Sequence, residues 1–180
     1  IIPLGGLQEI GKNMTAIEYK DEMIVIDCGL SFPEDEMLGI DVVIPDVSYL
    51  VKNHDKLKGI FLTHGHEDHI GAIPYVLRKL DVPIYGTKFT LALVEHKLKE
   101  NRILNAMLIE VPAGTSVKAG LFKIDYIRVT HSIPDSCALA VHTPLGIIYH
   151  SGDFKIDHTP IDNEVTDFHK MAEIGARGCL

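Results

Sequence analysis

The chain alternates short apolar runs with polar turns, and this pattern predicts a protein built largely from short β-strands. Runs of roughly four to eight apolar residues bounded by glycine, proline or aspartate are typical of strands. The first two predicted strands flank Lys20-Asp21-Glu22, which indicates a hairpin. We expect strands at residues 14–19, 23–27, 41–44, 59–63, 82–85, 107–111, 115–117, 122–130, 137–142 and 146–150.

Three other segments have the spacing of apolar residues that is typical of helices. In the first, Pro74 lies in the first turn, where a missing N–H costs little. In the second, Leu91, Val94 and Leu98 share one face. Gly175 is expected to end the third. We predict helices at residues 70–80, 87–102 and 166–174, and strands punctuated by helices favour a layered α/β fold.

The size and composition of the chain predict one compact unit. With 180 residues, of which 46% are hydrophobic, the chain can bury one core of ordinary size. No apolar run is long enough to cross a membrane, and residues 1–4 lack the features of an export signal. Cys28, Cys137 and Cys179 have no C-x-x-C spacing, so we expect buried, reduced thiols. These features predict a cytoplasmic protein with no membrane partner.

The densest group of metal-binding residue types is His64-Gly65-His66-Glu67-Asp68-His69, directly after the apolar run 59–63. Imidazole nitrogens and carboxylate oxygens are ligands of first-row transition metals. Two more apolar runs end in the same way, before His131 and before Asp153. Because ligands at the ends of adjacent strands converge, these segments predict a metal site. A solvated polar turn is the alternative interpretation of the first segment.

The spacing His64-x-His66-x-Asp68-His69 resembles the signature of the metallo-β-lactamase fold. Further motifs are similar to those of the ribonuclease J family, which belongs to the β-CASP branch of that superfamily. These motifs are residues 5–13 (GGLQEIGKN), 32–36 (FPEDE), 63–71 (THGHEDHIG), 130–136 (THSIPDS) and 152–155 (GDFK). The resemblance extends over essentially the whole chain.

The resemblance implies an αββα sandwich that is incomplete in this chain, and two divalent metal ions, zinc or manganese. It implies that one ion is held by His64, His66 and His131. Asp68 and His69 would help to hold the second, and Asp153 would bridge the two, so that Asp68 and Asp153 are also the candidate catalytic residues. The family takes one more histidine from a later segment, and no position here matches it. Asp27, in the sequence Ile26-Asp27-Cys28-Gly29, matches an aspartate that orients the ligand loop without binding metal.

The function implied by the resemblance is hydrolysis of RNA phosphodiester bonds, as a 5′-to-3′ exonuclease with endonuclease activity. Residues 1–180 would then be the N-terminal part of a metallo-β-lactamase domain. A β-CASP insertion and the remaining segment of the domain would lie outside this chain. We expect RNA as a partner, and a homo-oligomer or a hetero-oligomer with a paralogue. The net charge of −8 does not itself favour nucleic-acid binding, but two divalent cations would make the site locally positive.

Two other functions fit the same pattern. A small-molecule hydrolase, such as a thioesterase or a lactamase, uses the same fold but completes its site within one domain. A catalytically silent subunit that assembles with an active paralogue is the non-enzymatic alternative, and degenerate ligand motifs would indicate it. His150 lies three residues before Asp153, and alternation along a strand would turn it away from the site.

Overall fold

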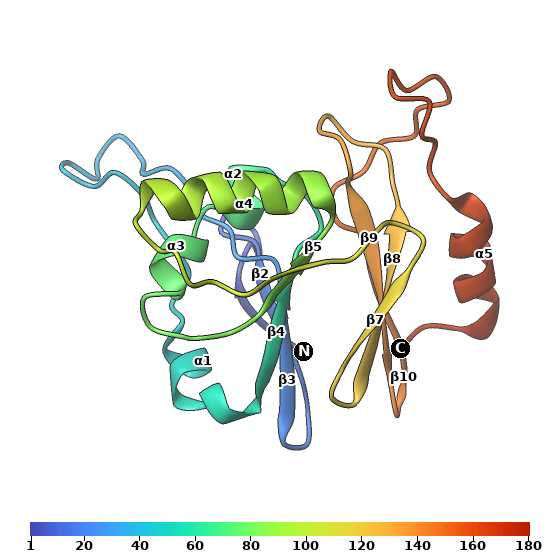
Figure 1. Cartoon of the computed structure of the whole chain (residues 1–180), viewed down its shortest axis with the longest axis horizontal. Helices are drawn as coiled ribbons and strands as arrows, with labels where there is room; N and C mark the ends of the chain where they lie inside the picture. Colours follow the sequence, from blue (N-terminus) through green and yellow to red (C-terminus); the bar gives the residue numbers. More distant parts are fainter.

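The structure is a computed structural model that describes residues 1–180, and it consists of two β-sheets packed face to face with helices outside them (Figure 1). The first sheet is mixed: its first three strands pair antiparallel, and from the third strand onward the pairing is parallel. Its strands, in spatial order, are β1 (Ile2–Gly5), β2 (Met14–Tyr19), β3 (Glu22–Ile26), β4 (Leu57–Phe61), β5 (Ile84–Gly86) and β6 (Leu108–Glu110).

The second sheet is entirely antiparallel, with the strand order β10-β9-β8-β7. Successive strands are neighbours in this sheet, so short turns suffice to connect them. The strands are β7 (Ser116–Ala119), β8 (Phe122–Arg128), β9 (Cys137–Thr143) and β10 (Gly146–His150).

Helices cover the outer face of each sheet (Figure 1). Those on the first sheet are α1 (Ser48–Lys52), the 3₁₀ turn η1 (His54–Lys56), α2 (Glu67–Ile70), α3 (Ile73–Val76) and α4 (Lys88–Glu100). The outer face of the second sheet carries α5 (Phe168–Arg177), whose Ile174 is buried against it. The layers therefore run helix, sheet, sheet, helix, and the predicted αββα sandwich is confirmed.

Alternation of side chains along the strands builds the apolar layers. Met23 and Val25 of β3 point toward the helices, whereas Ile24 and Ile26 of the same strand lie between the sheets. Burying each such side chain contributes about 1.5–3 kcal/mol. A strand with both faces covered reads as a continuous apolar run, which explains why its sequence lacks polar alternation.

The apolar layer between the two sheets fixes the position of one sheet relative to the other. Phe61 of β4 stacks on Tyr85 of β5 with the ring centroids 4.5 Å apart. Phe122 and Leu139, from the second sheet, pack into the same buried cluster. Loops that leave the two sheets at one end are therefore held close to each other.

The sequence predicted most strands and two of the three helices to within a few residues, and it was wrong at several places. Residues 41–44 form no strand, because Val43 makes only an isolated bridge to Ser31. The predicted helix 70–80 is two short helices, α2 and α3, and α1 was not predicted. Helix α5 passes through Gly175 and ends at Arg177. Cys179 is exposed, whereas Cys28 and Cys137 are buried as expected.

Candidate metal centre

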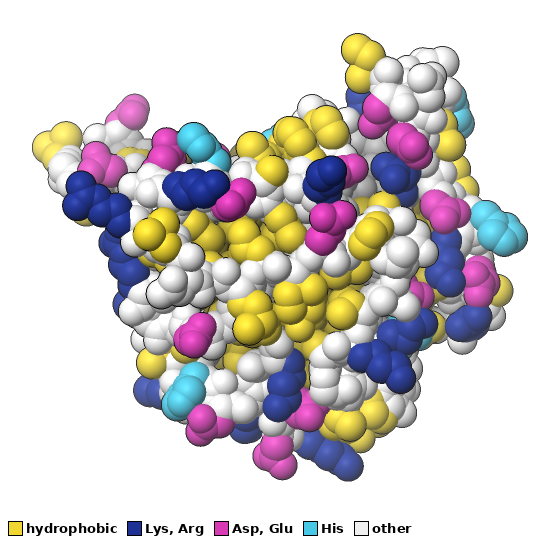
Figure 2. Space-filling model, in the orientation of Figure 1, with side chains coloured by type: hydrophobic (Ala, Val, Ile, Leu, Met, Phe, Trp, Pro, Cys, Tyr) yellow, Lys and Arg dark blue, Asp and Glu magenta, His cyan; other side chains and the backbone are white.

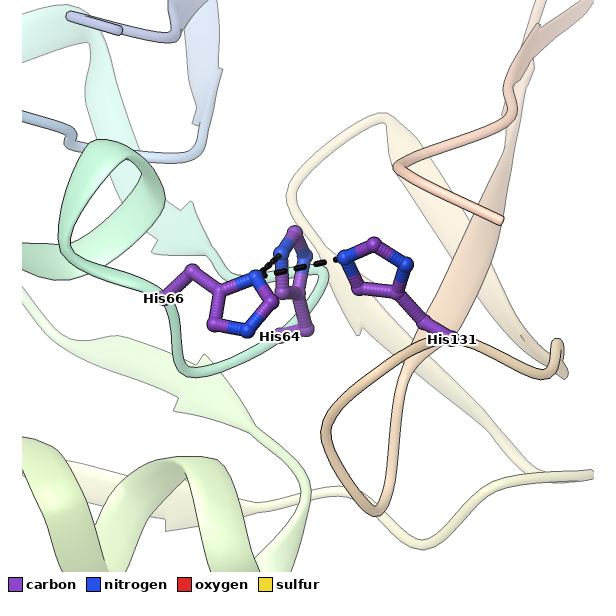
Figure 3. Close-up of side chains that lie close together, drawn as sticks. All are labelled: His64, His66 and His131. Carbon is purple, nitrogen blue, oxygen red and sulfur yellow. Dashed lines mark hydrogen bonds between the residues drawn. The ribbon is translucent and has the colours of Figure 1, made fainter. Parts of the chain in front are cut away.

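Three imidazoles from both sheets meet at one end of the sandwich. His64 and His66 lie in the loop between β4 and α2, and His131 lies in the loop between β8 and β9. Nδ1 of His66 is 3.0 Å from Nε2 of His64 and 3.2 Å from Nε2 of His131 (Figure 3). The ring nitrogens of these three residues lie within 4.8 Å of one another. The structure thus brings together three residues that sequence analysis assigned to the first ion.

A second group of ligand atoms adjoins the first and shares His64 with it. It consists of His64, His69 and Asp153, again with one ligand atom each within 4.8 Å of the others. Nε2 of His69 is 3.5 Å from a carboxylate oxygen of Asp153 and 3.5 Å from one of Asp68. The same oxygen of Asp153 is 3.9 Å from Nε2 of His131. Asp153 therefore lies between the two groups.

Asp27 is buried at the end of β3 and organises the loop that carries the histidines. One carboxylate oxygen accepts a hydrogen bond from the backbone N–H of Thr63 at 2.8 Å, and the other lies 2.8 Å from Nδ1 of His69. The backbone of Asp27 is in the left-handed region, with φ of 59°, which aspartate tolerates better than most residues. The side chain of Asp27 forms hydrogen bonds with Thr63 and His69 but none with His66 or His131, so its action is on the loop and on His69.

The hydrogen bonds of Asp27 also select the tautomers of two imidazoles. Thr63 Oγ1 donates its single hydrogen to the Asp27 carboxylate, so it accepts from Nδ1 of His64 at 2.9 Å. Nδ1 of His69 donates to Asp27 directly. In the neutral form of both rings, Nε2 carries the lone pair, and Nε2 is the atom that faces the ligand groups.

The electrostatics of the buried residues are dominated by the Asp27–His69 pair. Burial disfavours a charge on His69, but the carboxylates of Asp27 and Asp68 together outweigh burial and raise the pKa of His69 to about 10. Burial also opposes ionisation of Asp27, yet the charge of His69 holds its pKa below the usual range. Burial, together with the charge of His69, lowers the pKa of His64 to about 3. Burial and the neighbouring His66 lower the pKa of His131.

The donor set fits divalent transition metals. Neutral imidazole is the form that binds a metal, and the lowered pKa values of His64 and His131 favour that form. Ring nitrogens about 3 Å apart repel one another if both carry lone pairs and neither a cation nor a proton lies between them. No cysteine belongs to either group of ligand atoms. A nitrogen and oxygen ligand set of this kind suits a divalent metal.

The backbone of α2 is held by neighbouring segments, and this explains why the predicted helix is interrupted. A continuous helix would direct the N–H of Ala72 to the carbonyl of Asp68. Instead the Ala72 N–H donates to the carbonyl of Cys28 at 2.9 Å, and the Asp68 carbonyl accepts from the backbone N–H of Asn13 at 3.0 Å. The Cys28 N–H in turn donates to the carbonyl of His69 at 2.7 Å. Hydrogen bonds from α2 to the segments around Asn13 and Cys28 therefore replace hydrogen bonds of a continuous helix.

Sequence analysis did not assign Asn13 to the site, although its side chain contacts two candidate ligands. The amide nitrogen of Asn13 lies 3.2 Å from a carboxylate oxygen of Asp68 and 3.1 Å from Nε2 of His69. Asn13 ends one of the motifs that carry the resemblance, but no pattern in the sequence indicates its partners. His150, left out of the site, accepts a hydrogen bond from the backbone of Gly152 and belongs to neither ligand group.

Comparison with known proteins identifies relatives along the whole chain. Residues 8–171 match the metallo-beta-lactamase superfamily. Ribonuclease J 2 of Staphylococcus aureus is 50% identical over 99% of this chain and 32% of its own length. Ribonuclease J 2 of Staphylococcus saprophyticus is 48% identical with the same coverage. This chain therefore spans about a third of the length of these relatives.

Solved structures share the fold at low sequence identity. A protein of unknown function from Enterococcus faecalis has a TM-score of 0.69 and 20% identity, over 86% of this chain and 43% of that chain. The short form of human tRNase Z has a TM-score of 0.54 and 18% identity, over 84% of this chain and 66% of that chain.

No helix of this chain is both long enough and apolar enough to cross a membrane.

Proposed function

This chain belongs to the metallo-beta-lactamase superfamily, and on that basis we propose that it is the metal-binding part of a ribonuclease. The observation that carries the proposal is the convergence of His64, His66 and His131, with His69 and Asp153 beside them, at the seam between the two sheets. The identity of 50% with a ribonuclease J of S. aureus supports RNA as the substrate class. None of the ligand positions is degenerate, which argues against a silent subunit.

We assign the ligands as two overlapping sets. His64, His66 and His131 would hold one ion, and Asp68 with His69 would help to hold the other. Asp153 would serve both, since its carboxylate faces both groups. The ions would be zinc or manganese, because the ligands are nitrogen and oxygen atoms without thiolate. Two such ions, when bound, supply a nucleophilic water near neutral pH and stabilise the charge on a phosphodiester undergoing displacement.

The residues of the chain prepare this site before substrate arrives. Asp27 holds the loop through the Thr63 N–H and fixes the ring of His69. Lys97 of α4 holds the Glu67 carboxylate at 2.6 and 2.8 Å, which anchors the start of α2 from outside. A site held in this way needs little reorganisation when it binds a charged ligand.

The charge pattern of the surface is consistent with recognition of RNA mainly at the site itself and through parts of the protein beyond this chain. On the face seen in Figure 2, basic and acidic side chains are interspersed and form no continuous basic surface. The net charge of the chain is −8, and two divalent ions would offset about half of it within the cleft.

Several finer properties belong to the same proposal. We propose 5′-to-3′ exonuclease activity with endonuclease activity, a role in RNA processing and decay, and a cytoplasmic location. Residues 1–180 would form the N-terminal part of the metallo-β-lactamase domain, followed by a β-CASP insertion, and the full-length protein would form homo-oligomers or pair with a paralogue. The relatives, of which this chain covers 32%, are long enough to contain such parts.

Replacement of Asp153 by alanine in the full-length protein tests the assignment. We expect Asp153→Ala to abolish metal-dependent cleavage of a labelled RNA, while Asp81→Ala, on an exposed surface away from the site, retains the wild-type rate. Circular dichroism would establish that both variants are folded. Cleavage by Asp153→Ala within about tenfold of wild type, a difference of ~1.4 kcal/mol, would remove Asp153 from the site. Hydrolysis of a lactam or thioester without RNA cleavage by the wild type would favour the small-molecule hydrolase instead.

A further inference from the structure

The loop between β1 and β2 brings Asn13 against the metal motif. Gly11 and Lys12, immediately before it, both lie in the left-handed region, with φ of 90° and 54°. A non-glycine residue in this region is uncommon and costs conformational energy. The loop therefore follows an unfavourable path to deliver Asn13 at the start of β2, and residues 5–13 have no other role in the site described above.

The backbone of Asn13 joins three segments that meet at the site. Its N–H donates to the carbonyl of Asp68 at 3.0 Å, and its carbonyl accepts from the N–H of Gly29 at 2.9 Å. Gly29 permits this approach, because a Cβ there would lie 1.5 Å from the carbonyl oxygen of Asp68. These bonds do not require the Asn13 side chain, so they would survive its removal.

The side chain of Asn13 makes a separate set of contacts. Its Nδ2 donates to the Asp68 carbonyl at 3.1 Å and to the Asp68 carboxylate at 3.2 Å. An amide nitrogen offers two hydrogens and no lone pair for accepting, so Nδ2 can only donate to these two oxygens. The same Nδ2 is 3.1 Å from Nε2 of His69.

The Asp68 carboxylate needs a hydrogen bond such as that from Asn13 to keep its orientation. Its side chain is 35% exposed, whereas that of His69 is only 2% exposed and is already fixed by Asp27. Of the two candidate ligands assigned only to the second ion, Asp68 is therefore the one free to turn into solvent. The Asn13 amide holds its oxygen on the side facing Nε2 of His69, 3.5 Å away.

We propose that Asn13 is a positioning residue for the second metal ion, acting by holding the Asp68 carboxylate in its binding orientation. The inference deepens the proposed function and rests on it, because it presumes that Asp68 and His69 bind a metal. Ligand orientation by neighbouring hydrogen-bond donors commonly changes metal affinity by about 10- to 100-fold. Asn13 thus extends the site to a segment more than fifty residues away in sequence.

The test compares metal binding by variants of the full-length protein. Asn13→Ala removes the two side-chain hydrogen bonds and keeps the backbone ones. Asn53→Ala is the matched control, because Asn53 is also partly buried and its amide donates to a backbone carbonyl, that of Tyr49 at 2.9 Å, in another part of the fold. Asp68→Ala and the double variant Asn13→Ala/Asp68→Ala complete a cycle that shows whether Asn13 acts through Asp68.

Calorimetric titration with zinc and with manganese gives the affinity of each ion, and thermal unfolding of the metal-free protein gives the stability. We expect Asn13→Ala to weaken one of two ions by about tenfold or more and to leave the other within about threefold. Asn53→Ala should bind both ions as the wild type does. In the Asp68→Ala background, Asn13→Ala should cause no further loss.

Three results would overturn the inference. Unchanged affinity for both ions in Asn13→Ala would exclude a positioning role and leave the proposed ribonuclease untouched. Equal weakening of both ions, with a lower melting temperature and the same loss in the Asp68→Ala background, would show that Asn13 acts through folding. A wild-type protein that binds neither zinc nor manganese would overturn the inference and the proposed function together.

Discussion

Replacement of Asp27 by asparagine should disable metal binding while leaving the fold intact. Asparagine has nearly the same shape and, among residues other than glycine, is well suited to a φ of 59°, so the backbone at the end of β3 should not change. One side-chain oxygen remains to accept from the Thr63 N–H. The group facing Nδ1 of His69 becomes an amide N–H₂, which can only donate.

This change should reverse the tautomer of His69. To accept from the new amide, Nδ1 must lose its hydrogen, and in the neutral ring the hydrogen then moves to Nε2. Nε2 is the atom that lies 3.5 Å from Asp153, so a hydrogen would occupy the position that a metal needs. Loss of such an orienting contact weakens metal binding by about 10- to 100-fold. Breaking the buried Asp27–His69 ion pair should also cost about 3–5 kcal/mol of unfolding free energy, toward the lower end because His69 can become neutral.

A second buried aspartate provides the control. Asp125 pairs with His142 at 2.9 Å, on β8 and β9, and neither residue belongs to a candidate ligand group. Asp125→Asn therefore makes the same chemical change to an Asp–His pair outside the site. Calorimetric metal titration, urea unfolding and nitrogen NMR of the histidine tautomers would be measured for both variants. Metal affinity of Asp27→Asn within about threefold of wild type, or an equal loss in Asp125→Asn, would refute the reasoning.

Three further predictions concern stability. Burial opposes ionisation of Asp125, but the hydrogen bonds and charges of His142 and Lys123 together hold the pKa of Asp125 below its ordinary value of 3.8. The stabilisation that comes from ionised Asp125 is therefore present above that pH and is lost as the pH falls through the lowered pKa. The difference in urea-unfolding free energy between wild type and Asp125→Asn should accordingly be constant above about pH 5 and shrink below about pH 4; a constant difference down to pH 2 would contradict this. Gly29→Ala should lower the free energy of unfolding by more than about 3 kcal/mol in the same assay, because its Cβ would overlap the Asp68 carbonyl. A smaller loss would mean that the backbone segments at Gly29 and Asp68 move apart easily. Gly175→Ala, at an exposed helical position where an added Cβ would meet no neighbouring side chain or segment within 4 Å, should raise stability by about 0.5–1 kcal/mol, and a decrease would show an unrecognised contact.

The sequence predicted best where side-chain type alone determines the outcome. Met23 to Ile26 form a strand because apolar side chains on both faces find a layer to pack against. His64 and His131 come together because each follows a strand that ends at the same end of the sandwich. Patterns of this kind are local, and the layered fold turns them into contacts.

The errors arose where contacts from distant segments override local preference. Residues 70–80 have helical spacing, but Asn13 and Cys28 take backbone groups that a continuous helix through α2 and α3 would use. The contact between Asn13 and Asp68 depends on positive φ angles at Gly11 and Lys12, which no side-chain pattern encodes. A single bridge at Val43 shows that an apolar run becomes a strand only if a neighbouring strand is available.

The position of the ligands across the seam between the sheets has a mechanical consequence. His64 and His66 lie in a loop of the first sheet and His69 in the helix α2 that follows it, whereas His131 and Asp153 lie in loops of the second sheet. A bound ion would act as a reversible cross-link between two distant stretches of chain, so it would lower the conformational entropy available to partly opened states. Metal binding would stabilise the native state in proportion to the logarithm of metal concentration. Depletion of metal would then loosen the contact between the two sheets as well as stop the chemistry. The segments that the metal had joined would become more accessible to proteases.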